Sequence, residues 1–493
     1  MSSEIKDYSV KELRKKLDNK DISSVELTKY FIERVKRLDP DINSIITLNE
    51  EQALQSAANA DSLISYNKQS TLTGIPIIHK DNLCTKDIKT SAGSKMLDNF
   101  ISPYNSTIVN KCQDAGAITI GKSNMDEFSM GSTNETSYYK SVKNPWNKAH
   151  IPGGSSGGSA AAIASGLAPL ATGSDTGGSI RQPSAFCGVT GIKPTYGTVS
   201  RYGLIAFASS LDQVGTIAKS AEDCAYLLQS IQGYDPKDST SIQRSYKKLT
   251  IDLNNPIKGK TIGIPIEYFK ELKNKNIMKA LNESIATYKT LGAEIKEVSL
   301  KTCMKYAVSS YYLIATAEAA TNLSRYDGVR YGYRCKNPKD LEDLYTRSRS
   351  EGFGPEVKRR IMLGTFSLSS GYYDAYYSQA QKVRKMICME LEEIFKSVDV
   401  ILSPTTPSMP EKLEDSSINP IDRYLSDIYT TPANLAGLPA MSIPIGFSDM
   451  LPIGMQLIGK PFSESMLLNI ANQYQNVTSF HKVNITKNLG IKE

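Results

Sequence analysis

The residues of this sequence best suited to chemistry are two glycine–serine segments and one lysine. Residues 153–159 read Gly-Gly-Ser-Ser-Gly-Gly-Ser, and residues 174–183 read Ser-Asp-Thr-Gly-Gly-Ser-Ile-Arg-Gln-Pro. Both segments can present bare backbone N–H groups at a helix N-terminus, which suits an oxyanion. Lys80 ends a short apolar run that begins at Gly74 and is predicted to be a buried strand. Either segment alone would be an ordinary glycine turn, but two of them about 25 residues apart are harder to explain in that way.

The first segment also fits the G-x-S-x-G pattern of an α/β-hydrolase nucleophile elbow. Ser155 would then be the nucleophile, and Asp427 and His481 follow it in the required chain order. An elbow, however, needs a hydrophobic strand leading directly into it, and residues 144–152 are loop-like. His481 stands in a polar C-terminal tail, where we expect an exposed surface histidine. The elbow is therefore the weaker interpretation of Ser155.

A second competing motif, Gly116–Ser123, matches the Walker A pattern letter for letter and would make the chain an ATPase that uses Lys122. A phosphate loop needs small, flexible residues between its glycines. Here the interval is Ala-Ile-Thr-Ile, which prefers an extended strand. The pattern also follows a predicted helix at 107–115 and contains a predicted strand at 117–120, whereas a phosphate loop follows a strand and opens a helix. We interpret it as a chance match.

Composition narrows the class of protein. The chain has 493 residues, of which 40 % are apolar and 22 % charged, as in a soluble globular protein. The net charge of +7 is small and the signs are interspersed, which argues against a dedicated nucleic-acid surface. Three histidines argue against a histidine-rich metal site, and seven cysteines without a C-x-x-C pair fit reduced thiols in a cytosol. Without a signal peptide or a long apolar stretch, we expect a cytoplasmic protein with no membrane segment.

Predicted strands and helices alternate along the whole chain. Residues 1–70 read as helices, with capping boxes at Ser9/Glu12 and Ser23/Glu26. Residues 234–258 are polar and turn-rich, which predicts a surface linker or insertion. Strands are expected at 74–80, 117–120, 261–266, 294–298, 398–402, 440–445 and 453–458. Over residues 150–215, short strands are expected to alternate with glycine turns. Helices are expected at 107–115, 220–232, 277–291, most of 303–397 and from about 464. This alternation predicts an α/β fold with one large sheet covered on both faces.

The catalytic candidates, taken together, form one long and specific pattern: Lys80, residues 153–159, residues 175–183 and Lys193-Pro-Thr-Tyr-Gly197. This pattern resembles the amidase signature family. The resemblance narrows to the glutaminase subunits of tRNA-dependent amidotransferases through residues 124–132, 324–332, 351–354, 358–364 and 431–439. It covers essentially the full chain and implies the amidase signature fold in a single amidase domain, 1–493. N-terminal helices would occupy 1–70 and the signature core about 73–230, and the remainder would complete the sheet and the substrate pocket.

The resemblance implies a Ser-Ser-Lys triad. Ser179 would be the nucleophile, Ser155 the bridging serine and Lys80 the base. The lysine must then be neutral, and burial at the end of an apolar strand would lower its pKa. A hydroxyl can accept one proton while donating another, which suits the bridging role. The oxyanion would sit among the N–H groups of Thr176, Gly177, Gly178 and Ser179.

The same resemblance implies a pocket that holds a free amino acid by both ends. Asp427 would bind the ammonium group and Arg360 the carboxylate, with Arg359 as a rival for the second role. Tyr311 is a weaker candidate for a contact in this pocket. For Arg181 we expect a structural role in bracing the loop after Ser179. Lys358 to Arg360 could otherwise be the solvated face of a helix.

The implied reaction is glutamine hydrolysis through a glutamyl ester, with release of ammonia. The ammonia would pass to a GatB-like partner subunit, where ATP and Mg²⁺ activate the glutamate carried on mischarged tRNA(Gln). A small GatC-like subunit would tie the two together, and this chain itself would need no metal or cofactor. A free-standing amidase that acts on another amide remains the closest alternative, and a nucleic-acid-binding module is the weakest.

Overall fold

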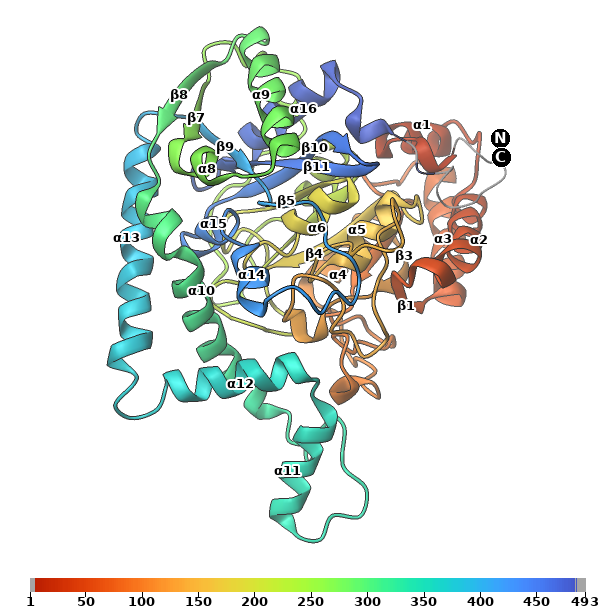
Figure 1. The fold of residues 1–493 in the computed structure, drawn as a ribbon. Coiled ribbons are helices and arrows are strands. Elements are labelled where there is room, and N and C mark those ends of the chain that lie inside the picture. Colours follow the sequence, from red (N-terminus) through yellow and green to blue (C-terminus); the bar gives the residue numbers. More distant parts are fainter. Residues whose placement is uncertain (1–4, 484, 486–493) are drawn as a thin grey trace.

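The computed structural model describes residues 5–483 and 485, and within them the chain forms one mixed sheet (Figure 1). The strand order is β1-β3-β2-β4-β6-β5-β10-β11-β9-β7-β8. The strands are β1 (Ile45–Leu48), β2 (Pro76–Lys80), β3 (Ile118–Ser123), β4 (Leu170–Asp175), β5 (Thr190–Lys193), β6 (Gln213–Ala218), β7 (Thr261–Pro265), β8 (Glu294–Val298), β9 (Val400–Pro404), β10 (Ala440–Ser448) and β11 (Leu451–Gly459).

The middle of the sheet brings the catalytic candidates to one edge. β2 pairs in parallel with both β3 and β4. The carboxyl ends of parallel strands lie at the same edge of a sheet, so Lys80 at the end of β2 and Asp175 at the end of β4 come together. β6 runs antiparallel to β4, and Gln213 pairs with Asp175 at this edge while Ala218 pairs with Leu170 at the other.

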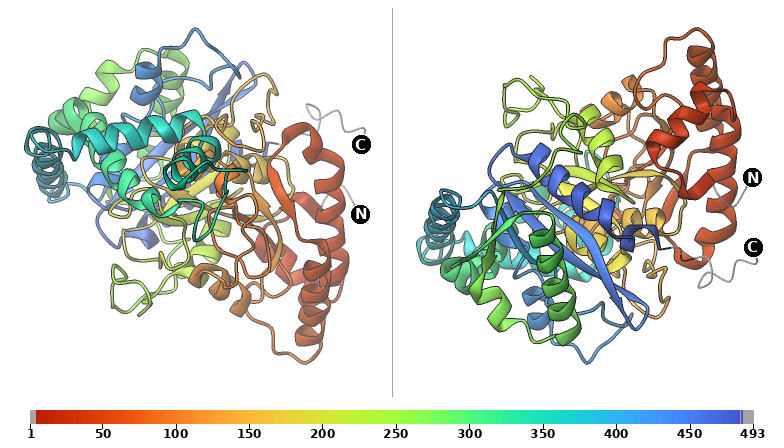
Figure 2. Two further views of the ribbon diagram at one scale, coloured as in Figure 1. Left: turned by 90° about the horizontal axis from the view of Figure 1, so that it is seen from below. Right: turned by 90° about the horizontal axis from the view of Figure 1, so that it is seen from above.

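Helices cover both faces of the sheet, as Figure 2 also shows. In β11, Gly454 lies against Ala185 of one helix and Gly459 against Leu467 of another. Residues five apart on a strand point to opposite faces, so these two helices, α6 and α16, lie on opposite sides. The helices are α1 (Val10–Asp18), α2 (Ser24–Ile42), α3 (Glu50–Ser65), α4 (Thr107–Asp114), α5 (Gly157–Ala164), α6 (Arg181–Cys187), α7 (Ala221–Ile231), α8 (Ile266–Glu271), α9 (Lys275–Thr290), α10 (Lys301–Asn322), α11 (Leu341–Gly352), α12 (Pro355–Ser367), α13 (Gln379–Ile394), α14 (Pro420–Leu425), α15 (Thr431–Leu435) and α16 (Glu464–Val477).

The elements expected from the sequence are largely confirmed. Both capping boxes form, at Ser9 and at Ser23. Residues 234–258 contain neither helix nor strand, as expected of a linker. β1 was not predicted, because it has only four half-buried residues and is defined by its antiparallel pairing with β3 rather than by a period of its own. In the part of the chain that the structure describes, no helix has the length and apolarity needed to cross a membrane.

Candidate active site

Lys80 lies at the centre of the candidate site. It is the last residue of β2, and its side chain is 0 % exposed. The Nζ atom donates hydrogen bonds to three hydroxyl oxygens, those of Ser155 at 2.8 Å, Ser156 at 2.9 Å and Ser174 at 2.9 Å. Ser155 and Ser156 precede α5, and Ser174 belongs to β4, so the lysine joins the two glycine–serine segments.

The surroundings of Lys80 favour its neutral form. Burial lowers the pKa of Lys80 to about 7, against the opposing influence of Asp126, Asp175 and Asp212. None of these carboxylates is an ion-pair partner of Nζ, whose described neighbours are hydroxyl groups and the Ser174 carbonyl at 3.4 Å. A substantial fraction of the lysine is therefore unprotonated near neutral pH, and its lone pair can accept a proton.

Ser179 lies beside this lysine centre. The backbone N–H of Ser156 donates to the Ser179 carbonyl at 3.1 Å, which ties the two serine segments together, and the Gly154–Ser155 peptide is cis. Ser155 is fully buried, whereas Ser179 is 8 % exposed. Among the described residues, no hydrogen bond joins the two hydroxyls. Catalytic hydrogen bonds are often loose before substrate binds, so the missing contact does not exclude Ser179 as the nucleophile.

The loop that carries Ser179 is braced by a buried ion pair. The Arg181 guanidinium donates to both carboxylate oxygens of Asp175, at 2.9 and 3.0 Å, and also reaches the Thr430 carbonyl. Burial opposes ionisation of Asp175, but Arg181 holds the pKa of this carboxyl well below its usual range. This is the structural role expected for Arg181.

The same carboxylate changes the predicted oxyanion site. The Gly178 N–H donates to Asp175 Oδ1 at 2.9 Å, so this donor is already used. The N–H groups of Thr176, Gly177 and Ser179 make no hydrogen bond within the described residues. The four predicted donors are therefore reduced to three, because the sequence could not show that Asp175 folds back onto its own loop.

The predicted amino-acid pocket is assembled from α10, α12 and the segment after α14. Asp427 accepts a hydrogen bond from the Tyr312 hydroxyl at 3.1 Å. The Arg360 guanidinium lies over the rings of Tyr312 and Phe207, at 5.4 and 5.5 Å from their centroids. Burial raises the pKa of Asp427 to about 7, although Tyr312 and Arg360 act in the opposite direction. Tyr312, which contacts both groups, was missed by sequence reasoning.

Tyr311 and the two candidate arginines are also placed by the structure. A Cβ added at Gly177 would lie 2.6 Å from the Tyr311 hydroxyl, so Tyr311 packs directly on the nucleophile loop. Arg360 is 4 % exposed, whereas the side chain of Arg359 is 50 % exposed and pairs with Glu356 at 2.6 Å. Arg360 also pairs with Glu356, at 2.8 Å, but on the inner side of α12. The geometry favours Arg360 over Arg359.

The chain is similar over nearly its whole length to known proteins. A family model described as Amidase matches residues 26–468. The A subunit of glutamyl-tRNA(Gln) amidotransferase from Thioalkalivibrio sulfidiphilus is 56 % identical over 474 residues, which span 96 % of this chain and 98 % of that protein. This chain belongs to the amidase family. The protein of the same name from Coxiella burnetii is also 56 % identical over 474 residues, with the same coverage.

Solved structures confirm the amidase fold predicted from the sequence. The A subunit of glutamyl-tRNA(Gln) amidotransferase from Thermotoga maritima is 38 % identical and has a TM-score of 0.80, over 96 % of this chain and 95 % of that one. A native peptide amidase from Stenotrophomonas maltophilia is 28 % identical with a TM-score of 0.79, over 95 % of this chain and 96 % of that one.

Within residues 5–483 and 485 of this amidase, no group of three or more His, Cys, Asp or Glu side chains is arranged to hold a metal ion.

The Walker A match of this amidase is not a phosphate loop. Residues 118–123 form β3, the strand beside that of Lys80, and Lys122 is fully buried. Its Nζ lies 3.3 Å from Asp81 Oδ1 and donates to the Leu83 carbonyl and the Thr90 hydroxyl, both at 2.9 Å. The interpretation as a chance match is confirmed, and Asp81 is a buried ion-pair partner of Lys122.

We expect Lys122→Met to lower the free energy of unfolding by about 3–5 kcal/mol, because it leaves the Asp81 carboxylate buried without its counter-charge. Urea denaturation measures this loss. Adding Asp81→Asn should recover part of it, since the pair is then removed as a unit. Unchanged stability together with loss of ATP binding by the isolated chain would instead restore the ATPase interpretation.

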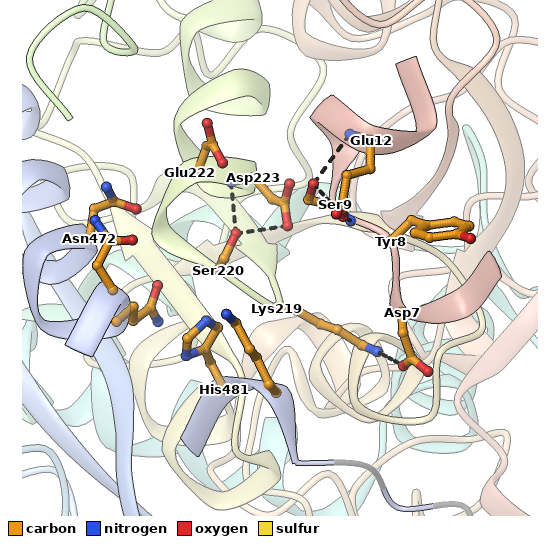
Figure 3. A pocket seen from close by; sticks show the side chains of 13 residues that line it. Asp7, Tyr8, Ser9, Glu12, Lys219, Ser220, Glu222, Asp223, Asn472 and His481 are labelled. Carbon is orange, nitrogen blue, oxygen red and sulfur yellow. Dashed lines mark hydrogen bonds and ion pairs between the residues drawn. The ribbon is translucent and has the colours of Figure 1, made fainter. Parts of the chain in front are cut away.

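The elbow interpretation also fails in this amidase. His481 lines a cavity of about 450 Å³ together with Lys219, Ser220 and Asp223 (Figure 3). These residues follow Ala218, at the end of β6 opposite to Gln213 and Asp175. The five residue steps between these ends span roughly 16 Å. His481 is therefore far from Ser155. It is also half-buried rather than exposed as expected, and burial lowers its pKa to about 4.

Proposed function

We propose that this amidase is the glutaminase subunit of a tRNA-dependent amidotransferase. It would hydrolyse glutamine and supply ammonia for the conversion of Glu-tRNA(Gln) to Gln-tRNA(Gln). The observation that carries the proposal is the buried Lys80–Ser155 contact beside Ser179, together with Asp427 and Arg360, which both contact Tyr312. The full-length likeness to proteins named as the A subunit of glutamyl-tRNA(Gln) amidotransferase supports the choice of reaction.

In the proposed mechanism, Ser179 Oγ attacks the side-chain amide carbon of glutamine. Its proton passes to Ser155, whose own proton passes to the neutral Lys80 amine. The negative charge that develops on the amide oxygen is stabilised by the N–H groups of Thr176, Gly177 and Ser179. Removing one such donor typically costs roughly 3 to 4 kcal/mol of transition-state stabilisation.

Breakdown of the tetrahedral intermediate reverses the proton path. The Lys80 ammonium returns a proton through Ser155 to the amide nitrogen, the C–N bond breaks and ammonia leaves. The glutamyl ester remains on Ser179. A water molecule then attacks the ester carbon, passing one proton along the same path. The ester C–O bond breaks, the proton returns to Ser179 and glutamate is released.

The pocket selects a free amino acid by charge. The α-ammonium of glutamine would bind Asp427, and this favours the ionised carboxylate against its raised pKa. The α-carboxylate would bind Arg360, whose Nη atoms are left for it because Nε is held by Glu356. Tyr311, against Gly177, would contact the substrate between these groups and the nucleophile.

The partners proposed are GatB-like and GatC-like subunits, with ATP, Mg²⁺ and the mischarged tRNA held mainly by the partner. The test is to assemble the chain with these subunits and to measure glutamine-dependent amidation of Glu-tRNA(Gln). Glutamine hydrolysis should be raised by the partner, tRNA and ATP together. A free-standing amidase would instead hydrolyse another amide with a rate that none of these additions changes.

Arg360→Ala should raise the KM for glutamine by about 30- to 100-fold with little change in kcat, since it removes charge-assisted hydrogen bonds made before and during the reaction. The matched control is Arg359→Ala on the same helix, which should change KM less than threefold because that side chain is half exposed. Steady-state ammonia release measures both. An equal effect of the two variants would contradict the assignment of Arg360.

A further inference from the structure

Three segments marked in the sequence have no part in the chemistry above, yet they meet at one point in the fold. They are residues 124–132, 324–332 and 351–354. The Phe128 ring packs on Tyr326 at 5.0 Å and on Phe353 at 5.6 Å between ring centroids. Beside this cluster, the Gly354 N–H donates to the Glu127 carboxylate at 2.8 Å. All three segments therefore support the start of α12.

Glu127 acts as the cap of this helix from a distant part of the chain. Gly354 is the N-cap residue of α12 and has no side chain with which to cap it. The helix receives an acceptor from Glu127 instead, a carboxylate at the helix N-terminus where the dipole favours it. Glu127 is 2 % exposed and also accepts a hydrogen bond from the Ser94 hydroxyl at 2.5 Å. A Cβ at residue 354 would lie 2.3 Å from Glu127 Oε2, so the contact is tight.

The capped helix carries the arginine of the substrate pocket. Arg360 lies six residues after Gly354 and is buried. Its helix, α12, crosses the lower end of α10 in Figure 1. Tyr312, on α10, contacts both Arg360 and Asp427. A displacement of the N-terminal turn of α12 would therefore move Arg360 relative to its pocket.

The neighbouring residue, Asp126, contacts the other half of the site. Its N–H donates to the Ser155 carbonyl at 3.3 Å. Its carboxylate accepts from Asn134 and Thr136 and occupies the space beside Gly154, where a Cβ would lie 2.0 Å from Oδ2. Two consecutive residues thus connect the serine loop with the helix of the substrate arginine.

We propose that Glu127 is a positioning residue that sets the distance between the catalytic serines and the group that binds the substrate carboxylate, by capping α12 while Asp126 packs against the Ser155 loop. This rests on the proposed function, in which Arg360 binds the α-carboxylate of glutamine. In this role Glu127 acts through α12 rather than by contact with the substrate, so its effect should be confined to substrates that have that carboxylate.

The experiment compares glutamine with 4-aminobutanamide, which is glutamine without its α-carboxylate. The quantity measured is the ratio of the two kcat/KM values, from ammonia release by the assembled complex. Glu127→Ala should lower this ratio by about tenfold or more, because small displacements of a binding group are costly. Gly354→Ala, which displaces the carboxylate from the other side, should lower it in the same direction. Glu127→Gln keeps a hydrogen-bond acceptor for the Gly354 N–H and should retain most of the ratio.

Asp340→Ala is the matched control. Asp340 caps the preceding helix, α11, through the Asp343 N–H at 2.8 Å, and that helix carries no pocket residue. The ratio of the two kcat/KM values in Asp340→Ala should stay within twofold of the ratio in the unmodified protein. The positioning role would be overturned if Glu127→Ala and Gly354→Ala each lost the same activity on both substrates. It would also be overturned if both variants kept the ratio while Arg360→Ala abolished the preference for glutamine. An unchanged ratio in Arg360→Ala would overturn the proposed pocket itself.

Discussion

Ser179→Ala is expected to reduce glutamine hydrolysis by about 10⁴-fold or more, because it removes the atom that forms the glutamyl ester. The fold should persist, since the Ser179 hydroxyl makes no hydrogen bond within the described residues and the loop is held by the Asp175–Arg181 pair. Ammonia release from glutamine measures the loss. In the assembled complex, free ammonium should still support amidation, which separates loss of the nucleophile from loss of assembly.

Two further variants complete this test. Ser155→Ala should also be severely impaired, because Lys80 then loses the hydroxyl that is proposed to relay the Ser179 proton. His481→Ala should be near normal, since His481 lies at the opposite end of β6 from the site. The reverse pattern, with Ser155→Ala and His481→Ala inactive and Ser179→Ala active, would establish the elbow that we reject.

The residues of the candidate triad could be named from the sequence, but the surroundings of the lysine could not. Types and spacing identified Lys80 and the two serine segments. Ser156 and Ser174, which also accept hydrogen bonds from Lys80, were not distinguished from other serines of those segments. Their contact with Nζ depends on the parallel pairing of β2 with β4, and on the turn before α5, and neither leaves a local signal.

The same limit explains the other omissions. Arg359 and Arg360 are adjacent, so their residue type could not show which of them binds the substrate carboxylate. Only the way in which α12 packs against α10 decides that Arg360 is buried and Arg359 is exposed. Tyr312 looked like any aromatic residue of a long helix. The capping role of Glu127 joins residues 227 positions apart. Lys122 was correctly rejected as a phosphate ligand because β-branched neighbours already predicted a strand, although its buried partner Asp81 was not foreseen.

The pH dependence of glutamine hydrolysis should report Lys80. The pKa of this lysine is lowered to about 7, so its neutral, active fraction rises with pH. We expect kcat to increase about tenfold between pH 6 and pH 8 and then to level off. Asp427, whose pKa is raised to about 7, must be ionised to bind the ammonium group and gives kcat/KM a second rise in the same direction. Bound glutamine holds Asp427 ionised, so kcat at saturation isolates the lysine.

Lys80→Arg should be as inactive as Lys80→Ala. Both variants should lose glutamine hydrolysis by at least about 10³-fold, which is on the order of the loss when other catalytic bases are removed. The guanidinium keeps the positive charge and can donate to the three serine hydroxyls, but it cannot lose a proton in the working pH range. If Lys80 held the loops only by charge, arginine would rescue much of the activity, and substantial hydrolysis by folded Lys80→Arg would remove the lysine from the role of base. Both variants should retain ammonium-driven amidation in the assembled complex, because that reaction bypasses the glutaminase site. Loss of the ammonium-driven reaction in both would trace the defect to folding or assembly, since the lysine is fully buried between β2, β4 and the turn before α5.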